Sequence, residues 1–208
     1  MNTRTKFVGL LAVLLSLAIL PACWTGSLHA LYEHDDQHLT YDPALEGTWQ
    51  QIGNECQTCR LLITGDSKAQ QYTLQLIDLH DTKCNCGSGE GPEIKFEGRL
   101  VQLGTQRFLD AFPQGDISMG AIPAHNIFKI TVEGDSLSMV APSDDWLCDA
   151  LEVEQARLGE CRNGDFVLTA ATELLQDFMQ NHAEDEGVFP SPSEDDEWHR
   201  AGKPGDSK

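Results

Sequence analysis

The segment Tyr72-Thr73-Leu74-Gln75-Leu76-Ile77 places Tyr72, Leu74 and Leu76 on one side of an extended chain. This period of two is that of a β-strand with one face in the core. The same pattern predicts further short strands at 47–50, 60–64, 94–103, 107–112, 124–132 and 137–141. Tight turns such as Glu133-Gly134-Asp135 join them, so we expect an antiparallel meander rather than parallel strands with crossover helices.

Two helices are expected near the C-terminus. Pro142-Ser143-Asp144-Asp145 is typical of a helix start with Ser143 as the N-cap, and this first helix should cover 143–153. After a short strand at 166–168, Thr169 is the expected cap of a second helix. The apolar residues of that helix recur as a stripe that should pack on the sheet: Leu174, Leu175, Phe178 and Met179.

Composition excludes several classes of function. The chain has 208 residues, of which 14 are cationic and 33 acidic, giving a net charge of −19. Nucleic acid is a poor partner for such a chain, because phosphate binding needs clustered cations. The sequence has no Gly-x-Ser-x-Gly, Gly-x-x-x-x-Gly-Lys or His-Glu-x-x-His motif. His80-Asp81 and Asp144-Asp145 are interpreted as solvated surface groups, so we expect a protein that is not an enzyme.

The N-terminus has the three-part layout of a secretory signal. Arg4 and Lys6 precede one apolar run of 14 residues, 7–20, which is too short to span a bilayer comfortably. Small residues and a cysteine follow in Leu20-Pro21-Ala22-Cys23. Removal of residues 1–22 would leave 186 residues with a net charge of 12 − 33 = −21. An ordinary signal cleaved near Ala22 is the alternative.

Leu20-Pro21-Ala22-Cys23 resembles the lipobox of bacterial lipoproteins. The resemblance implies that Cys23 becomes the lipidated first residue of the mature chain, so that acyl chains such as palmitate hold the protein to a membrane of the bacterial cell envelope. Trp24 stands where an aspartate would, by family analogy, retain a lipoprotein at the inner membrane. The resemblance therefore implies the outer membrane if the cell is Gram-negative.

Four regions are expected along the chain: the signal at 1–22, a lipid-anchored tether at 23–42, a β domain with helices at 43–183, and an acidic disordered tail at 184–208. The tether holds His29, His34 and His38 among acids, and we interpret it as a solvated linker rather than a metal site. Trp198 in the tail could belong to an interaction peptide.

Six cysteines remain once Cys23 carries lipid, and an even set in an exported chain predicts disulfides. Cys148 and Cys161 should form one bridge. If the strands at 60–64 and 72–77 form a hairpin, its geometry brings four other cysteines together, pairing Cys59 with Cys84 and Cys56 with Cys86. A tetrathiolate zinc site or a redox-active Cys-x-x-Cys are the two alternatives for these four.

Leu45-Glu46-Gly47-Thr48-Trp49 is similar to the Gly-x-Trp motif of lipocalins. The layout from 43 to 182 also resembles small bacterial lipoproteins with a lipocalin-like domain. This resemblance implies that the meander closes into an up-and-down barrel of seven or eight strands. It also implies that Trp49 plugs the closed end of that barrel.

These expectations lead to a first hypothesis, a membrane-anchored lipoprotein that binds a small apolar ligand inside the barrel. The candidate lining residues are Trp49, Leu74, Leu76, Phe96, Leu100, Phe128 and Ile130. A core filled by these side chains is the alternative, because an eight-stranded barrel is only just wide enough for its own side chains or one small ligand. The other hypotheses are an envelope structural or protein-interaction lipoprotein without a small ligand, and a zinc-binding protein built on the four cysteines.

Overall fold

The computed structural model describes residues 25–34, 36–51, 60–77, 94–115, 123–149, 157–162 and 164–201. Its strands and helices are, in chain order, β1 (Gly26–Ser27), β2 (Leu39–Thr40), η1 (Pro43–Leu45), β3 (Gly47–Gln51), β4 (Arg60–Asp66), β5 (Gln71–Ile77), β6 (Ile94–Leu103), β7 (Gln106–Gln114), β8 (His125–Glu133), β9 (Ser136–Val140), α2 (Asp144–Asp149), β10 (Gly159–Arg162), β11 (Asp165–Leu168), α3 (Thr172–His182) and β12 (Glu197–Arg200).

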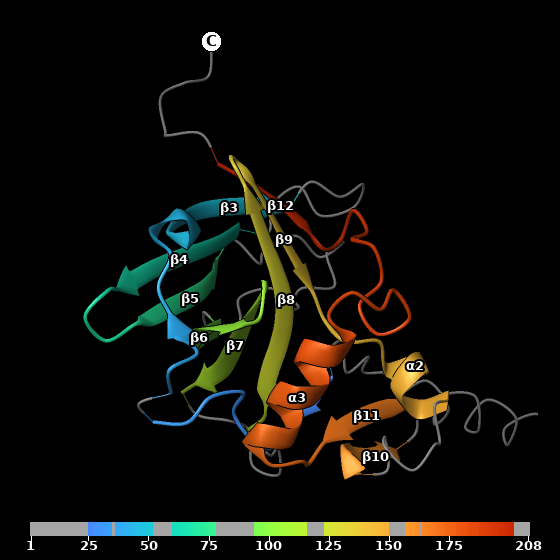
Figure 1. The fold of residues 1–208 in the computed structure, drawn as a ribbon. Helices are drawn as coiled ribbons and strands as arrows, with labels where there is room; N and C mark the ends of the chain where they lie inside the picture. Colours follow the sequence, from blue (N-terminus) through green and yellow to red (C-terminus); the bar gives the residue numbers. More distant parts are fainter. Residues whose placement is uncertain are drawn as a thin grey trace, which may run out of the picture.

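Strands β3 to β9 form the predicted antiparallel meander, each paired with the next. The short strand β12 then pairs antiparallel with both β9 and β3, which closes the ring (Figure 1). The fold is therefore a closed eight-stranded antiparallel barrel of lipocalin-like form with two helices, which confirms the predicted fold class.

The C-terminal region differs from the prediction of a disordered tail, which is wrong for residues 184–201. Val188 and Phe189 are buried in a hydrophobic core, and Trp198 packs at the edge of the barrel interior within β12. Because β12 is only four residues long and bears no apolar period, its sequence carries no strand signal. The strand forms since it finds unpaired edges on both sides.

The N-terminal segment is likewise not a tether from Thr25 onward. Strand β1 pairs antiparallel with the start of β8 and parallel with β11, and Leu31 is fully buried. Helix α3 holds the same segment, because Thr172 donates a hydrogen bond to the carbonyl of Ala30 and Gln176 donates one to that of Leu31. Most of these contacts are made by backbone atoms, so the pattern of apolar residues in the sequence gave no signal for them.

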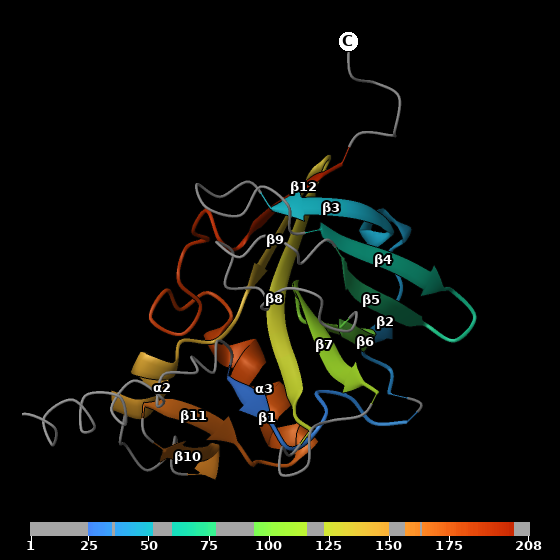
Figure 2. The ribbon, with the colours of Figure 1, turned by 180° about the vertical axis from the view of Figure 1, so that it is seen from behind.

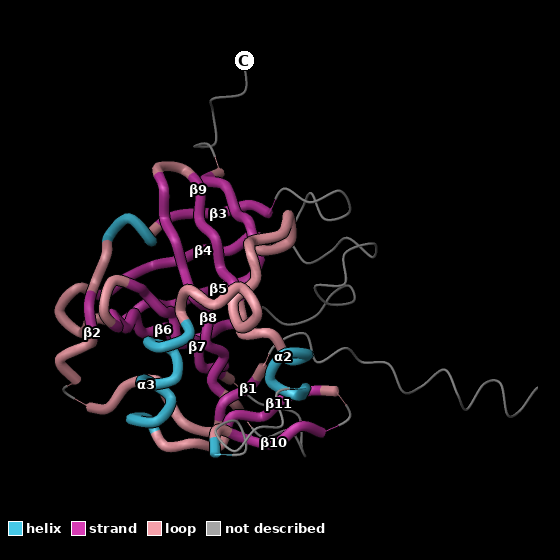
Figure 3. The backbone as a smooth tube through the Cα atoms, turned by 45° about the vertical axis from the view of Figure 1, so that its right-hand side comes forward, coloured by secondary structure: helices cyan, strands magenta, loops and turns pink. Residues whose placement is uncertain are grey.

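Two hydrophobic cores lie on either side of the strands β6, β7 and β8. One fills the barrel, and the other lies outside it, beneath α3 and residues 188–189. The stripe of α3 packs in the outer core, with Leu175 and Met179 fully buried, as expected. Figure 3 shows both helices outside the barrel. Among the described residues, no helix is long and apolar enough to cross a membrane.

The starts of the two helices agree only in part with the N-caps predicted from the sequence. The Ser143 hydroxyl accepts a hydrogen bond from the amide of Trp146, as expected of an N-cap. The prediction that Thr169 caps the second helix is wrong, because α3 begins after Ala171 and has no side-chain cap. The predicted disulfide between Cys148 and Cys161 is confirmed, and it joins α2 to β10.

Candidate functional site

One end of the barrel is sealed by a tryptophan and an arginine. Trp49 is fully buried, and its indole N–H donates to the carbonyl of Leu45 in η1 at 2.9 Å. The guanidinium of Arg200 lies 4.2 Å from the centre of the Trp49 ring. It also donates to the carbonyls of Glu46 (2.8 Å) and Ala44 (2.9 Å). Arg200 in β12 thus contacts the residues that lead into β3, and the pattern of apolar residues gave no signal for this contact.

Two stacked tyrosines extend this closed end. The rings of Tyr41 and Tyr72 are nearly parallel, with centres 4.9 Å apart. The hydroxyl of Tyr72 accepts a hydrogen bond from the Asp42 amide at 2.7 Å, and burial raises the pKa of Tyr72 to about 12. Tyr41 donates to the Glu46 carboxylate at 2.5 Å, and this hydrogen bond raises the pKa of Tyr41 to about 12. Both phenols are therefore neutral donors at physiological pH.

The seven predicted lining residues all belong to the hydrophobic cluster inside the barrel. At mid-height the interior is tightly packed, because Leu74 lies over Gly98. A Cβ at Gly98 would come within 2.4 Å of the Leu74 side chain and 3.3 Å of Leu109. Glycine in a strand often marks such a close approach.

Burial decreases toward the other end of the barrel. Along β5, Tyr72 and Leu74 are buried whereas Leu76 is half-buried. Along β6, Phe96 is also half-buried, and Ile94, which pairs with Leu76, is 39% exposed. We call this the open end, defined by Leu76, Ile94 and Phe96. Three connections between barrel strands start from this end and lie outside the described residues: 52–59, 78–93 and 116–122.

The proposed lipidation site and the cysteine quartet lie outside the described residues, as does His80-Asp81. The topology nevertheless bears on where the quartet is attached. Cys56 and Cys59 belong to the connection between β3 and β4, and Cys84 and Cys86 to that between β5 and β6. In an up-and-down meander these two connections leave the barrel at the same end. Because the four cysteines themselves lie outside the described residues, the disulfides, the zinc site and the redox pair all remain predictions.

A buried carboxylate on the outer face of β7 has no counterpart in the sequence predictions. Asp110 is 1% exposed, accepts the amide N–H of Leu31 at 2.7 Å and lies 2.6 Å from Nδ1 of His125. Its only sequence signal is an acid at an otherwise apolar strand. Since Leu31 belongs to the N-terminal segment, this pair fixes that segment to the barrel.

The three N-terminal histidines are not gathered into a metal site. Among the residues with described positions, no group of three or more His, Cys, Asp or Glu side chains could hold a metal ion. His38 instead lies 2.7 Å from the carboxylate of Asp36. Burial opposes the charge of Asp36, but hydrogen bonds from the His38 amide and the Gln176 side chain outweigh it, and the pKa of Asp36 is lowered.

A polar cavity of about 240 Å³ lies on the outside of the barrel. It separates β8 and β9 from residues 184–192, and its lining includes Lys129, Thr131 and Ser138. The amine of Lys129 donates to the carbonyl of Ala183 at 2.7 Å, so this cation stabilises the C-terminal segment. The cavity does not open into the apolar interior, because these three side chains point away from it.

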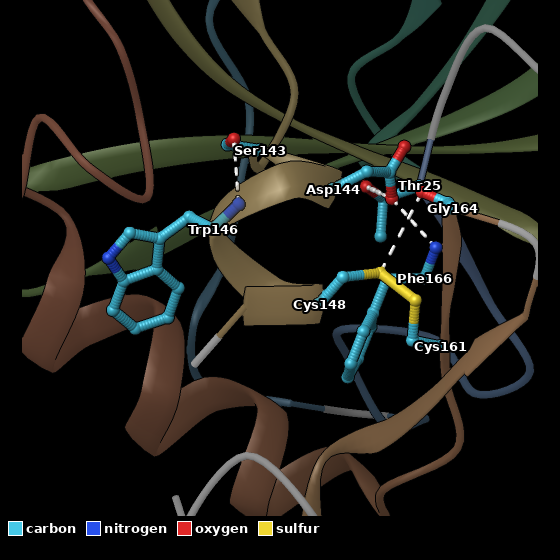
Figure 4. The surroundings of a disulfide bond; sticks show 8 residues. All are labelled: Thr25, Ser143, Asp144, Trp146, Cys148, Cys161, Gly164 and Phe166. Atoms are coloured by element: carbon cyan, nitrogen blue, oxygen red, sulfur yellow. Dashed lines mark hydrogen bonds between the residues drawn. A yellow bond between two sulfur atoms is a disulfide. The ribbon is translucent and has the colours of Figure 1, made fainter. Parts of the chain in front are cut away.

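The start of the described chain is firmly held beside α2 (Figure 4). Thr25 is 2% exposed, and its hydroxyl bonds to the carbonyl of Pro142 at 3.0 Å and to the carboxylate of Asp144 at 2.7 Å. The same Asp144 oxygen accepts the amide of Phe166 at 3.0 Å. The prediction that Asp144 is a solvated surface acid is therefore wrong, since it links three segments, whereas its neighbour Asp145 is exposed.

Comparison with known proteins finds no matching family model, no similar curated protein and no similar solved structure.

Proposed function

We propose that this chain is a non-catalytic, lipid-anchored protein of the bacterial cell envelope, and that it binds a small apolar molecule at the open end of its barrel. The observation that supports ligand binding is the change in burial along the interior. The apolar lining is sealed at Trp49 and reaches the surface at Ile94. An apolar surface that continues from the core to the outside is where a hydrophobic ligand gains most from leaving water.

The packing limits the size of this ligand. Leu74 packs closely against Gly98 at mid-height, so a ligand would contact the half-buried side chains beyond them, Leu76 and Phe96. The deeper candidates Trp49, Leu100 and Ile130 would serve as the floor rather than as direct contacts. We expect the part of the ligand that enters the barrel to be one short apolar group, because the interior of an eight-stranded barrel is narrow.

The anchor rests on sequence. The signal-like segment and Leu20-Pro21-Ala22-Cys23 support lipidation at Cys23, and Trp24 supports the outer membrane if the cell is Gram-negative. Two or more acyl chains on one residue would make the attachment stable. The membrane is then the first partner of the protein.

Two exposed apolar side chains provide a matched test of ligand binding. Ile94 is 39% exposed at the open end, and Leu28 is 44% exposed near β1, away from the barrel interior. Thermal unfolding is measured with and without a lipid extract. We expect the extract to raise the melting temperature of the wild type and of Leu28→Asp, but not that of Ile94→Asp. No shift for any lipid, or an equal shift for both variants, would contradict the proposal.

A second candidate is an envelope structural or interaction lipoprotein without a small ligand. The contact between Leu74 and Gly98 favours it, because it is what a filled core requires. Deleting residues 184–208 does not test this candidate cleanly, since β12 closes the barrel. Intact mass measurement under native conditions separates the two candidates: a small molecule that stays bound supports the first.

A further inference from the structure

The distance between the proposed anchor and the folded domain is set by covalent geometry. Cys23 is two residues before Thr25, and consecutive Cα atoms are about 3.8 Å apart, so the two Cα atoms are separated by at most about 7.6 Å. Thr25 itself is buried and makes two hydrogen bonds. A free chain from Cys23 to Asp42 would instead reach about 65 Å at roughly 3.4 Å per residue.

The position of Thr25 relative to the barrel is fixed by strand pairing. Residues Gly26 and Ser27 pair with Asn126 and His125, which are the first two residues of β8. The β8 strand starts at the open end, since it follows the connection 116–122. Pro142, which binds Thr25, follows the end of β9 and lies at this same end. Figure 2 shows β1, β10 and β11 together, far from the turn between β4 and β5.

We infer that the lipid on Cys23 holds the open end of the barrel against the bilayer, with the surface around the N-terminus of α2 and the turn before β11 as the membrane-facing side. This inference rests on the proposed lipidation of Cys23. With no free tether after Thr25, the domain cannot turn its closed end toward the membrane while the native contacts of Thr25 persist. The apolar lining at Ile94 then faces the side from which lipid molecules arrive, so the bilayer is the source of the apolar ligand.

The charge of this surface limits the kind of membrane that it fits. Asp145, in the first turn of α2, and Asp165, at the start of β11, are exposed there. Like charges repel when little salt screens them, so a zwitterionic lipid surface suits this side better than an anionic one. The acyl anchor supplies the attraction.

The orientation is tested by energy transfer from two positions on the full-length, exported protein. A fluorescent non-natural residue replaces either Asp165, which follows the turn before β11, or Lys68, which lies in the turn between β4 and β5 at the closed end. The purified lipoprotein is placed in phosphatidylcholine vesicles that contain acceptor-labelled lipid. We expect at least twofold stronger quenching at 165 than at 68, because β6 alone, at ten residues, spans about 33 Å.

A flexible insertion provides the control. About 20 Gly and Ser residues between Trp24 and Thr25 add a mean reach of roughly 25 Å, which should bring the quenching at the two positions close together without changing the melting temperature. Intact mass decides the anchor separately. An acylated wild type with equal quenching at 165 and 68 would overturn the inference alone. A mature chain without acyl mass would overturn the proposed anchor and the inference with it.

Discussion

Replacement of Arg200 by methionine tests whether the contact between β12 and the start of β3 holds the barrel closed. Methionine keeps an apolar stem over the Trp49 ring but removes the charge and both donors to Ala44 and Glu46. Each hydrogen bond contributes about 1 kcal/mol at a partly exposed site, and the cation–π contact contributes about 0.5–1 kcal/mol. The Arg200 side chain is 30% exposed, so we take the low end of these ranges. We expect a loss of about 2.5 kcal/mol in the free energy of unfolding, from two hydrogen bonds of about 1 kcal/mol each and a cation–π contact of about 0.5 kcal/mol.

Urea unfolding followed by tryptophan fluorescence measures this loss. Arg200→Lys should lose less, since a cation stays over the ring while the paired donors are gone. Lys68→Ala removes an exposed cation from the turn between β4 and β5 and should change stability by less than about 0.5 kcal/mol. If Arg200→Met were as stable as Lys68→Ala, then the contacts of Arg200 would not hold this end of the barrel closed.

Three further predictions follow from the other contacts. Replacing Cys148 and Cys161 together should cost about 3 kcal/mol in the chain-entropy model for their separation of 13 residues. Urea unfolding of the variant against the oxidised wild type measures this loss. The phenols of Tyr41 and Tyr72 should not ionise near pH 10 in the folded protein, which absorbance at alkaline pH can follow. Because their folded pKa values lie above the unfolded one, their contribution to stability is complete below pH 10 and is lost between about pH 10 and 12. Thermal unfolding over this pH range measures the loss. The last prediction concerns the quartet of Cys56, Cys59, Cys84 and Cys86. Mass spectrometry of the non-reduced chain should find two bridges and no metal there, whereas four free thiols with bound zinc would support the metal site instead.

The sequence determined the parts of the fold that have a local period. The alternation at Tyr72, Leu74 and Leu76 identified a strand and its buried face, and the stripe on α3 identified the packed side of that helix. The pairing of Cys148 with Cys161 also followed from counting, once Cys23 was assigned to lipid and the other four cysteines to the hairpin. In each case a single stretch or a simple count carried the whole signal.

Only the tertiary structure decided how the barrel closes and how its N-terminal segment is held. Strand β12 has four residues, and β1 has two, so neither is long enough to show a period. Both are stabilised by backbone hydrogen bonds to strands that are distant in sequence. The role of Arg200 above Trp49 and that of Asp110 beside Leu31 depend in the same way on partners that the fold brings together. A hydrophobic pattern records which side chains leave water, whereas these contacts join backbone and polar groups whose partners exist only after the chain has folded.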